Sequence, residues 1–393
     1  HYEILSGEFD MLDDDSKILA WFLGPKAENA SNFEELMLLT LRDYAHWRRN
    51  YFPSDEVLLT KSLQRDLENH YDRLFQNLLE MTAELRRNFP FYSPRYIAHM
   101  LSDTLLPSML GYFAGMLYNP NNVTPEAAPV TVDMEIEACN EIIKMLGFTP
   151  SPSVPKEFDQ KAISDYKKEL QCEFGWAHIT HGGTTANLEA LWVARTIKYA
   201  PLSIWDIARK EQLAIEVKLP NGQSKDIKKF SKKQLLSIKP NEAVYLLAKY
   251  VDAYRAKHNL PLKEASSSAY GLLNTSQYSL NKGLGKILQE FPPVLFVSGT
   301  AHYSVQKAAD ILGIGRDNIE MIQMDSSFRI DIQDLGVKIR RAITQNRIPL
   351  AVISIMGTTE EGAVDPVHRI LDLRNELETQ ENVSFWIHVD AAW

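Results

Sequence analysis

Four short polar motifs, each following an apolar run, contain the residue types that could do chemistry. The first is His-Gly-Gly-Thr-Thr at 181–185, which separates the apolar run 176–180 from a helix expected over 184–199. Glycines let the backbone approach an anion, hydroxyls add donors, and the N–H groups at a helix start point to the same place. The motif therefore predicts a phosphate site, although a capped turn without a ligand fits the same residues.

Two further motifs follow the apolar runs 293–298 and 350–356. The first contains His302, and a histidine there can stack on a flat ring, act as an acid or base, or bond within its own turn. The second places Thr358 and Thr359 after its run. The Asp365-Pro366 pair that comes next is interpreted as a plain helix N-cap.

The fourth motif is His-Val-Asp-Ala-Ala at 388–392, in a run that is apolar except for His388 and Asp390. A carboxylate at the end of a buried strand is costly unless a cation or hydrogen-bond donors satisfy it. A protonated ring nitrogen is one such partner, and an arginine or a backbone turn would serve equally.

Apolar runs alternate with helical patterns over the second half of the chain, and this alternation must position the four motifs. It predicts βαβ units and a mainly parallel sheet that helices cover on both faces. In such a sheet, ligands bind beyond the carboxyl ends of the strands. The predicted strands are 176–180, 293–298, 318–323, 350–356 and 384–390, and the predicted helices are 184–199, 302–312, 331–346 and 365–380.

Two other segments differ from this alternation. Residues 31–90 show helical spacing of apolar side chains, broken at 51–55, where Ser54 or Asp55 is a candidate N-cap. The stretch 216–290 is interpreted as a solvated insertion with one or two helices, best at 240–258, rather than as an anion-binding patch. The aromatic side chains of the N-terminal helices fit an internal core and a subunit contact equally well, and they are Tyr44, Trp47, Tyr51 and Phe52.

Composition narrows the class of protein. The 393 residues carry 42 Lys+Arg against 51 Asp+Glu and are 45% apolar, which excludes disordered, collagen-like and disulfide-stapled chains. The acidic excess argues against a nucleic-acid partner. Cys139 and Cys172 form no metal or disulfide pattern, so we expect no metal site and a cytoplasmic setting. The apolar stretch 106–118 is too short to cross a bilayer, so no membrane partner is expected.

Together, the four motifs contain the parts needed to hold pyridoxal phosphate: a phosphate site, a histidine to cover the ring, hydroxyls, and an aspartate for the ring nitrogen. In this combination the sequence resembles the group II pyridoxal-phosphate-dependent amino-acid decarboxylases, α/β proteins with the aspartate aminotransferase fold (fold type I) and a mainly parallel, seven-stranded type of sheet. The resemblance covers nearly the whole chain. It is most similar to bacterial tyrosine decarboxylases at 24–29, 47–51, 95–100, 119–123, 186–189 and 307–311.

The resemblance implies decarboxylation of an L-amino acid, tyrosine first, to its amine and CO2 by a homodimer with the active site at the interface. His302 and Asp390 are the implied catalytic residues: His302 stacks on the ring and Asp390 pairs with the ring nitrogen. The other implied site residues are Gly183 and Thr184 at the phosphate, Ala392 on the opposite ring face, Thr358 or Thr359 near the ring hydroxyl, and His99 at the substrate mouth.

The resemblance also implies a domain plan: a helical N-terminal segment at 1–125 for dimerisation and the substrate mouth, then a cofactor-binding large domain at 126–393. The Schiff-base lysine and a small C-terminal domain are expected beyond Trp393. One alternative is a glutamate or aspartate decarboxylase, which Arg95 and the region of His99 would distinguish by clamping a distal carboxylate. Others are an aminotransferase and a lysine-less, non-catalytic cofactor-binding subunit that pairs with an intact partner.

Overall fold

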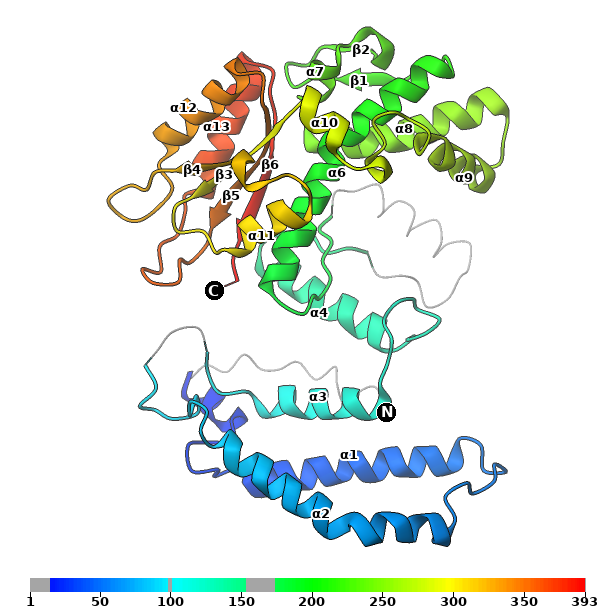
Figure 1. Ribbon diagram of the computed structural model, residues 1–393, viewed down its shortest axis with the longest axis vertical. Helices are drawn as coiled ribbons and strands as arrows, with labels where there is room; N and C mark the ends of the chain where they lie inside the picture. Colours follow the sequence, from blue (N-terminus) through cyan, green and yellow to red (C-terminus); the bar gives the residue numbers. More distant parts are fainter. Residues whose placement is uncertain (1–14, 98–100, 153–173, 393) are drawn as a thin grey trace. The chain divides into compact units, whose positions relative to one another are not determined.

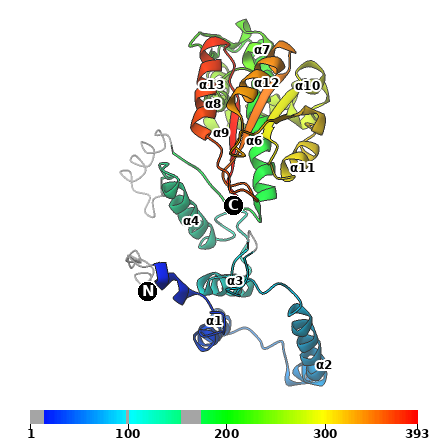
Figure 2. The same cartoon turned by 90° about the vertical axis from the view of Figure 1, so that its left-hand side faces the viewer.

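The computed structural model describes residues 15–97, 101–152 and 174–392 (Figures 1 and 2). The chain divides into two compact units, His1–Ile179 and Thr180–Trp393. Among the described residues, no helix has the length and apolar character that a membrane crossing requires.

The first unit is helical, as its sequence predicts. Thr60, and not Ser54 or Asp55, is the N-cap of the second long helix, because the chain stays irregular through residue 59 and the Thr60 side chain then accepts from the Leu63 N–H at 3.4 Å. In its described residues the helices of this unit are α1 (Ala30–Asn50), α2 (Lys61–Leu85), α3 (Leu106–Tyr118), α4 (Thr131–Met145) and the 3-10 helix η1 (Asp15–Trp21).

The second unit begins with the long helix α6 (Gly183–Lys210). The stretch 216–290 packs against its second half, and the best predicted helix is confirmed as α8 (Pro240–His258). The prediction of a solvated insertion is wrong, because this stretch supplies most of one apolar core, with Ile227, Leu246 and Tyr250 fully buried. Its other elements are β1 (Glu216–Lys218), β2 (Ser224–Asp226), η2 (Ile227–Lys229), α7 (Lys232–Leu235), α9 (Leu262–Leu273), η3 (Leu280–Lys282) and α10 (Gly285–Glu290).

The parallel sheet occupies the rest of this unit, which confirms the predicted α/β class. Its strands lie in the order β4-β3-β5-β6, and all neighbours are parallel. The strands are β3 (Pro293–Ser298), β4 (Ile319–Ile322), β5 (Ile348–Ile355) and β6 (Trp386–Asp390), and the intervening helices are α11 (Ser304–Ile311), η4 (Arg316–Asn318), α12 (Ile332–Thr344) and α13 (Val367–Gln380).

Helices cover both faces of the sheet, and the alternation of side chains in β3 shows why its sequence is continuously apolar. Val294 and Phe296 join the core beneath α12 and α13, whereas Leu295 and Val297 join the core beneath α6 and α11. Figure 1 shows these two pairs of helices on opposite sides of the strands.

The predicted strand at 176–180 is wrong. This segment has no regular secondary structure, and the Ile179 N–H donates to the Glu135 carboxylate at 2.9 Å instead of to a strand. A strand forms only where a neighbouring backbone pairs with it. The apolar residues Trp176 and Ile179 are correspondingly exposed.

Candidate active site at the carboxyl edge of the sheet

Three strands and one helix bring the sequence-predicted residues to one edge of the sheet. The β5–β6 register pairs Ile355 with Asp390, so both strands end at the same level, and β3 ends beside them at Ser298. His302 lies in the loop after β3 and Thr358 in the loop after β5. Since parallel strands are spaced by about 4.8 Å, the ends of β3 and β6 are separated by roughly 10 Å.

Helix α6 begins at this edge and approaches the end of β6 closely. Gly182 is its N-cap residue, and no side chain caps the helix, so the first N–H groups have no side-chain acceptor. A Cβ atom at Gly183 would lie 3.2 Å from Cβ of Ala392. The glycine therefore lets the helix start and the His-Val-Asp-Ala-Ala segment lie next to each other.

The Asp390 carboxylate is held by one side chain and by its own turn. Its Oδ2 accepts from Asn187 Nδ2 at 2.8 Å, and its Oδ1 accepts from the Ala392 N–H at 3.3 Å. The Asp390 carbonyl accepts from the Met356 N–H at 2.8 Å, which joins the ends of β5 and β6. The carboxylate is half-buried and keeps lone pairs for a further donor.

Asn187 connects the two residues to which the sequence assigns catalysis. Its buried amide also donates to Ser304 Oγ at 3.0 Å, and Ser304 Oγ lies 2.8 Å from His302 Nδ1. Sequence reasoning missed Asn187 and Ser304, because their partners are far away in the chain. The only sequence signal is that both are polar residues in the first turns of helices that follow candidate motifs.

His388 completes this cluster from the strand side. It lies two residues before Asp390, so both side chains leave β6 on the same face, and its Nε2 lies 2.7 Å from Asn187 Oδ1. Burial lowers the pKa of His388 below its usual value, while the Asp390 carboxylate opposes this shift. A neutral imidazole with its proton on Nε2 donates to the amide oxygen.

The predicted stacking residue, His302, is exposed at the same edge. Its Nδ1 accepts from the Ser304 N–H at 3.2 Å, which leaves the ring proton on Nε2. The His302 ring also lies 4.0 Å from the Tyr303 ring, between centroids, with the planes tilted by 37°. Two contacts with its own loop therefore restrain the ring, and the residue is still exposed to solvent.

Of the two threonines after β5, Thr358 is occupied by its own turn. Its buried hydroxyl accepts from the Ala363 N–H at 2.9 Å and donates to Glu361 Oε2 at 3.1 Å. Thr359 is half-buried beside it.

The interpretation of Asp365 as a helix N-cap is wrong, because Pro366 is the N-cap residue of α13. The buried Asp365 carboxylate instead accepts from the N–H groups of Ile330 and Ile355, both at 2.7 Å. Burial raises its pKa, and these two backbone hydrogen bonds oppose that shift. Asp365 thus joins the end of β5 to the segment before α12 rather than capping a helix.

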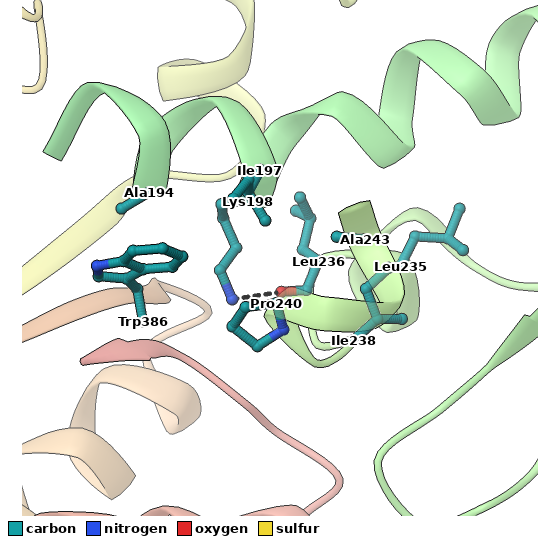
Figure 3. Close-up of a pocket in the computed structure, with 9 residues that line it drawn as sticks. All are labelled: Ala194, Ile197, Lys198, Leu235, Leu236, Ile238, Pro240, Ala243 and Trp386. Carbon is teal, nitrogen blue, oxygen red and sulfur yellow. Dashed lines mark hydrogen bonds between the residues drawn. The ribbon is translucent and has the colours of Figure 1, made fainter. Parts of the chain in front are cut away.

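Lys198 is a buried lysine that must be distinguished from a cofactor lysine. Burial lowers its pKa to about 7, which is the range of a reactive amine. However, its Nζ donates to the carbonyls of Leu236 at 3.0 Å and Ser384 at 2.8 Å. Figure 3 shows the amine directed at the Leu236 carbonyl beside Trp386.

The surroundings of Lys198 exclude a cofactor there. The adjoining cavity of about 10 Å³ holds one water molecule at most. Lys198 lies three turns along α6 from Asn187, roughly 16 Å at 1.5 Å per residue. Its partner Ser384 precedes the amino end of β6, opposite to the end that carries Asp390. Lys198 therefore joins two loops and has no place at the candidate site.

His99, the predicted substrate-mouth residue, lies outside the described residues. Arg95, the other residue named for substrate choice, is described and exposed.

Comparison with known proteins shows what the chain is similar to. Residues 285–393, which include His302 and Asp390, match the model of the pyridoxal-dependent decarboxylase conserved domain.

The similar relatives include two curated bacterial enzymes. The L-tyrosine decarboxylase of Levilactobacillus brevis is 33% identical over 385 residues, which are 96% of this chain and 51% of the relative. The L-tyrosine decarboxylase of Enterococcus faecalis is 32% identical over 381 residues, 95% of this chain and 51% of the relative. The chain thus spans about half the length of these relatives. Among solved structures, mouse CSAD aligns over 93% of this chain and 55% of its own, with a TM-score of 0.48 and 19% identity.

Proposed function

We propose that this chain is part of a pyridoxal-phosphate-dependent decarboxylase that converts an L-amino acid, L-tyrosine first, to its amine and CO2. The observation that carries the proposal is the gathering of Gly183, His302 and Asp390 at the carboxyl edge of one parallel sheet. The relatives named for L-tyrosine support the choice of substrate.

The residues at this edge fit the cofactor. No side chain caps the start of α6, so its first backbone N–H groups are available for a phosphate. Gly183 has no Cβ, and a Cβ there would press on Ala392. Asp390 keeps acceptor capacity for a ring N–H, and the exposed His302 would be able to stack on the ring. Thr184 would add a hydroxyl to the phosphate, and Ala392 would lie against the second ring face.

Each residue then has a defined task. When bound, pyridoxal phosphate supplies an electron sink for the charge left as CO2 departs. Asp390 would hold a proton on the ring nitrogen, and its fixed negative charge would stabilise the charged ring. His302 would cover one face of the ring and help to hold it in place. Of the two threonines, we favour Thr359 for the ring hydroxyl, since Thr358 is bonded within its turn.

The lysine that attaches the cofactor is proposed to lie beyond residue 393. Lys198 has the low pKa of a reactive amine, but its two carbonyl partners and the small cavity beside it leave no access to a ring.

We also propose a homodimer, because the N-terminal helices expose their apolar faces in the single chain. Neither α1 nor α2 has a buried residue, and Tyr71, Leu74 and Leu78 along α2 are each about half exposed. A second subunit that covers these faces would remove this apolar surface from water. The free, buried Cys139 is consistent with a reducing, cytoplasmic location.

The test is a substrate panel on the full-length protein supplied with pyridoxal phosphate. We expect equimolar tyramine and CO2 from L-tyrosine, and slower release from L-glutamate and L-aspartate. Preferred release from an acidic substrate would move the assignment to the glutamate or aspartate alternative. Amino-group transfer to a keto acid without CO2 would contradict decarboxylation.

A further inference from the structure

We propose that Asn187 is a positioning residue that holds Asp390 and the loop of His302 in one arrangement for the cofactor ring. The inference rests on the proposed function and adds a residue to its site. It comes from the hydrogen bonds of a single buried amide, which joins the end of β6 to the start of α11, the helix that follows β3. The strands β3 and β6 are not neighbours in the sheet.

The orientation of the Asn187 amide is fixed by all its partners. Its Nδ2 group has two acceptors, Asp390 Oδ2 at 2.8 Å and Ser304 Oγ at 3.0 Å. Its Oδ1 accepts from His388 Nε2 at 2.7 Å. A flipped amide would place its oxygen against the Asp390 carboxylate and its N–H groups against the His388 N–H, so only one orientation satisfies every atom.

This orientation determines how Asp390 meets the ring. A hydrogen bond from an uncharged amide to a carboxylate steadies the charged group without neutralising it. With Oδ2 held by Asn187 and Oδ1 by the Ala392 N–H, the carboxylate plane is defined by two donors. The remaining lone pairs therefore point in a set direction, as a stable pairing with a ring N–H requires.

The second branch of the network reaches His302. Ser304 Oγ accepts from Asn187 and can then donate its single proton to His302 Nδ1 at 2.8 Å. The Ser304 N–H donates to the same nitrogen at 3.2 Å. The branch keeps Nδ1 an acceptor and fixes the ring plane. One amide thus sets the positions of the groups proposed for the ring nitrogen and for one ring face.

Asn187 is carried on a rigid element. It is 4% exposed and lies near the start of α6, which packs on β5, β6 and α11. Leu191, one turn further along, is fully buried in the core beneath this helix. The amide is therefore placed by helix packing rather than by a loop.

The test compares two isosteric changes in the full-length protein loaded with pyridoxal phosphate. Asn187→Asp keeps the shape but removes the N–H donors and sets a second carboxylate beside Asp390. The control is Asn318→Asp, since Asn318 is also partly buried and bonded, to the Ile314 carbonyl and to Arg347, but lies away from the site. Equilibrium dialysis gives the cofactor Kd, and visible circular dichroism reports the ring orientation.

We expect Asn187→Asp to raise the Kd at least about tenfold and to change the visible circular dichroism band, because a charge-assisted hydrogen bond is lost. The cofactor Kd of Asn318→Asp should stay within about twofold of the wild-type value, because the substitution lies away from the site. Cofactor binding and a circular dichroism band at wild-type values in folded Asn187→Asp protein would overturn the inference.

A second pair keeps the test decisive if Asn187→Asp does not fold. His388→Phe removes the donor that orients the amide, whereas His388→Gln retains an N–H donor. We expect weaker cofactor binding in the phenylalanine variant and recovery in the glutamine variant, and equal binding in both would overturn the inference. A wild-type protein that binds no pyridoxal phosphate would overturn the proposed function and the inference with it. If the wild type binds the cofactor and Asn187→Asp binds it equally well, only the inference fails.

Discussion

Asp390 is the residue on which the proposed chemistry depends most, because it is the carboxylate at the carboxyl edge that is held by two donors and still open to a third. Asp390→Asn should keep part of the bound cofactor, since the amide retains the shape, but lose turnover by roughly a hundredfold or more, because a neutral group no longer stabilises the ring proton. The measurement is kcat on the best substrate at saturating cofactor.

The control for this change is Asp310→Asn, an exposed carboxylate on α11 that pairs with Arg316 at the surface. It should turn over at the wild-type rate. Unchanged turnover in Asp390→Asn would remove the assigned role of this residue.

His302→Ala should weaken cofactor retention and slow decarboxylation together, because the ring loses its cover on one face. Cofactor loss on dilution and kcat are measured on the same preparations, with His368→Ala as the matched control, since His368 is an exposed histidine of the same unit. If retention and rate both stayed at wild-type values, the stacking assignment would be wrong.

At this scale the sequence predicts the residues that end a strand but not those that connect strand ends. His302 and Asp390 follow apolar runs and are visible as polar exceptions. Asn187 and Ser304 bond to partners 203 and 117 residues away, and such pairs exist only once the sheet is assembled. The same holds for Asp365, whose two donors come from the end of β5 and from the segment before α12.

At the scale of elements, the buried Lys198, which joins Leu236 to Ser384 near the amino end of β6, predicts how the stability of the fold depends on pH. Lys198 has a pKa of about 7 in the folded chain and an ordinary value of 10.5 when unfolded. Between these values the unfolded state binds more protons, so the free energy of unfolding rises with pH through this window. Lys198→Met lacks this contribution. The free energy of unfolding of the wild type should therefore rise by up to about 1.4 kcal/mol per pH unit more than that of Lys198→Met.

Urea unfolding at pH 7.5, 8.5 and 9.5 measures this slope. Lys239→Met is the control, because Lys239 bonds to Glu378 with a half-exposed side chain and should leave the slope as in the wild type. Parallel slopes for the wild type and Lys198→Met would contradict a desolvated amine.

The elements themselves are predictable where local pattern and burial agree. β3 and β5 are apolar at nearly every position and are buried on both faces, and the helix at 240–258 carries its own start and stop signals. The incorrect predictions concern segments whose structure depends on contacts with neighbouring elements. The run 176–180 has the composition of a strand, but no strand among the described residues pairs with it. The stretch 216–290 carries its lysines outside and packs its apolar residues into a core, which its charged composition does not indicate.

For the whole molecule, the apolar faces of α1 and α2 predict the oligomeric state. A protein without residues 1–90 should form monomers or aggregates, because those faces are lost from the proposed interface. Light scattering after size exclusion measures the mass. A cofactor-loaded dimer after this deletion would refute the proposal.

A milder variant protects this test against simple misfolding. Leu74→Glu with Leu78→Glu places charges on the apolar face of α2, where both side chains are about half exposed in the single chain. Glu80→Lys alters a charged residue of the same helix and serves as the control. The double variant should dissociate at concentrations where the control stays dimeric.

The central claim is that this chain holds pyridoxal phosphate through the carboxyl edge of its sheet and that the buried Lys198 does not attach it. The most direct measurement is the intact mass of the full-length protein after borohydride reduction with pyridoxal phosphate, followed by peptide mapping of the adduct. We predict one reduced adduct, on a lysine outside residues 1–393, and its loss in Asp390→Asn with His302→Ala. An adduct on Lys198, or a protein with none, would contradict the account.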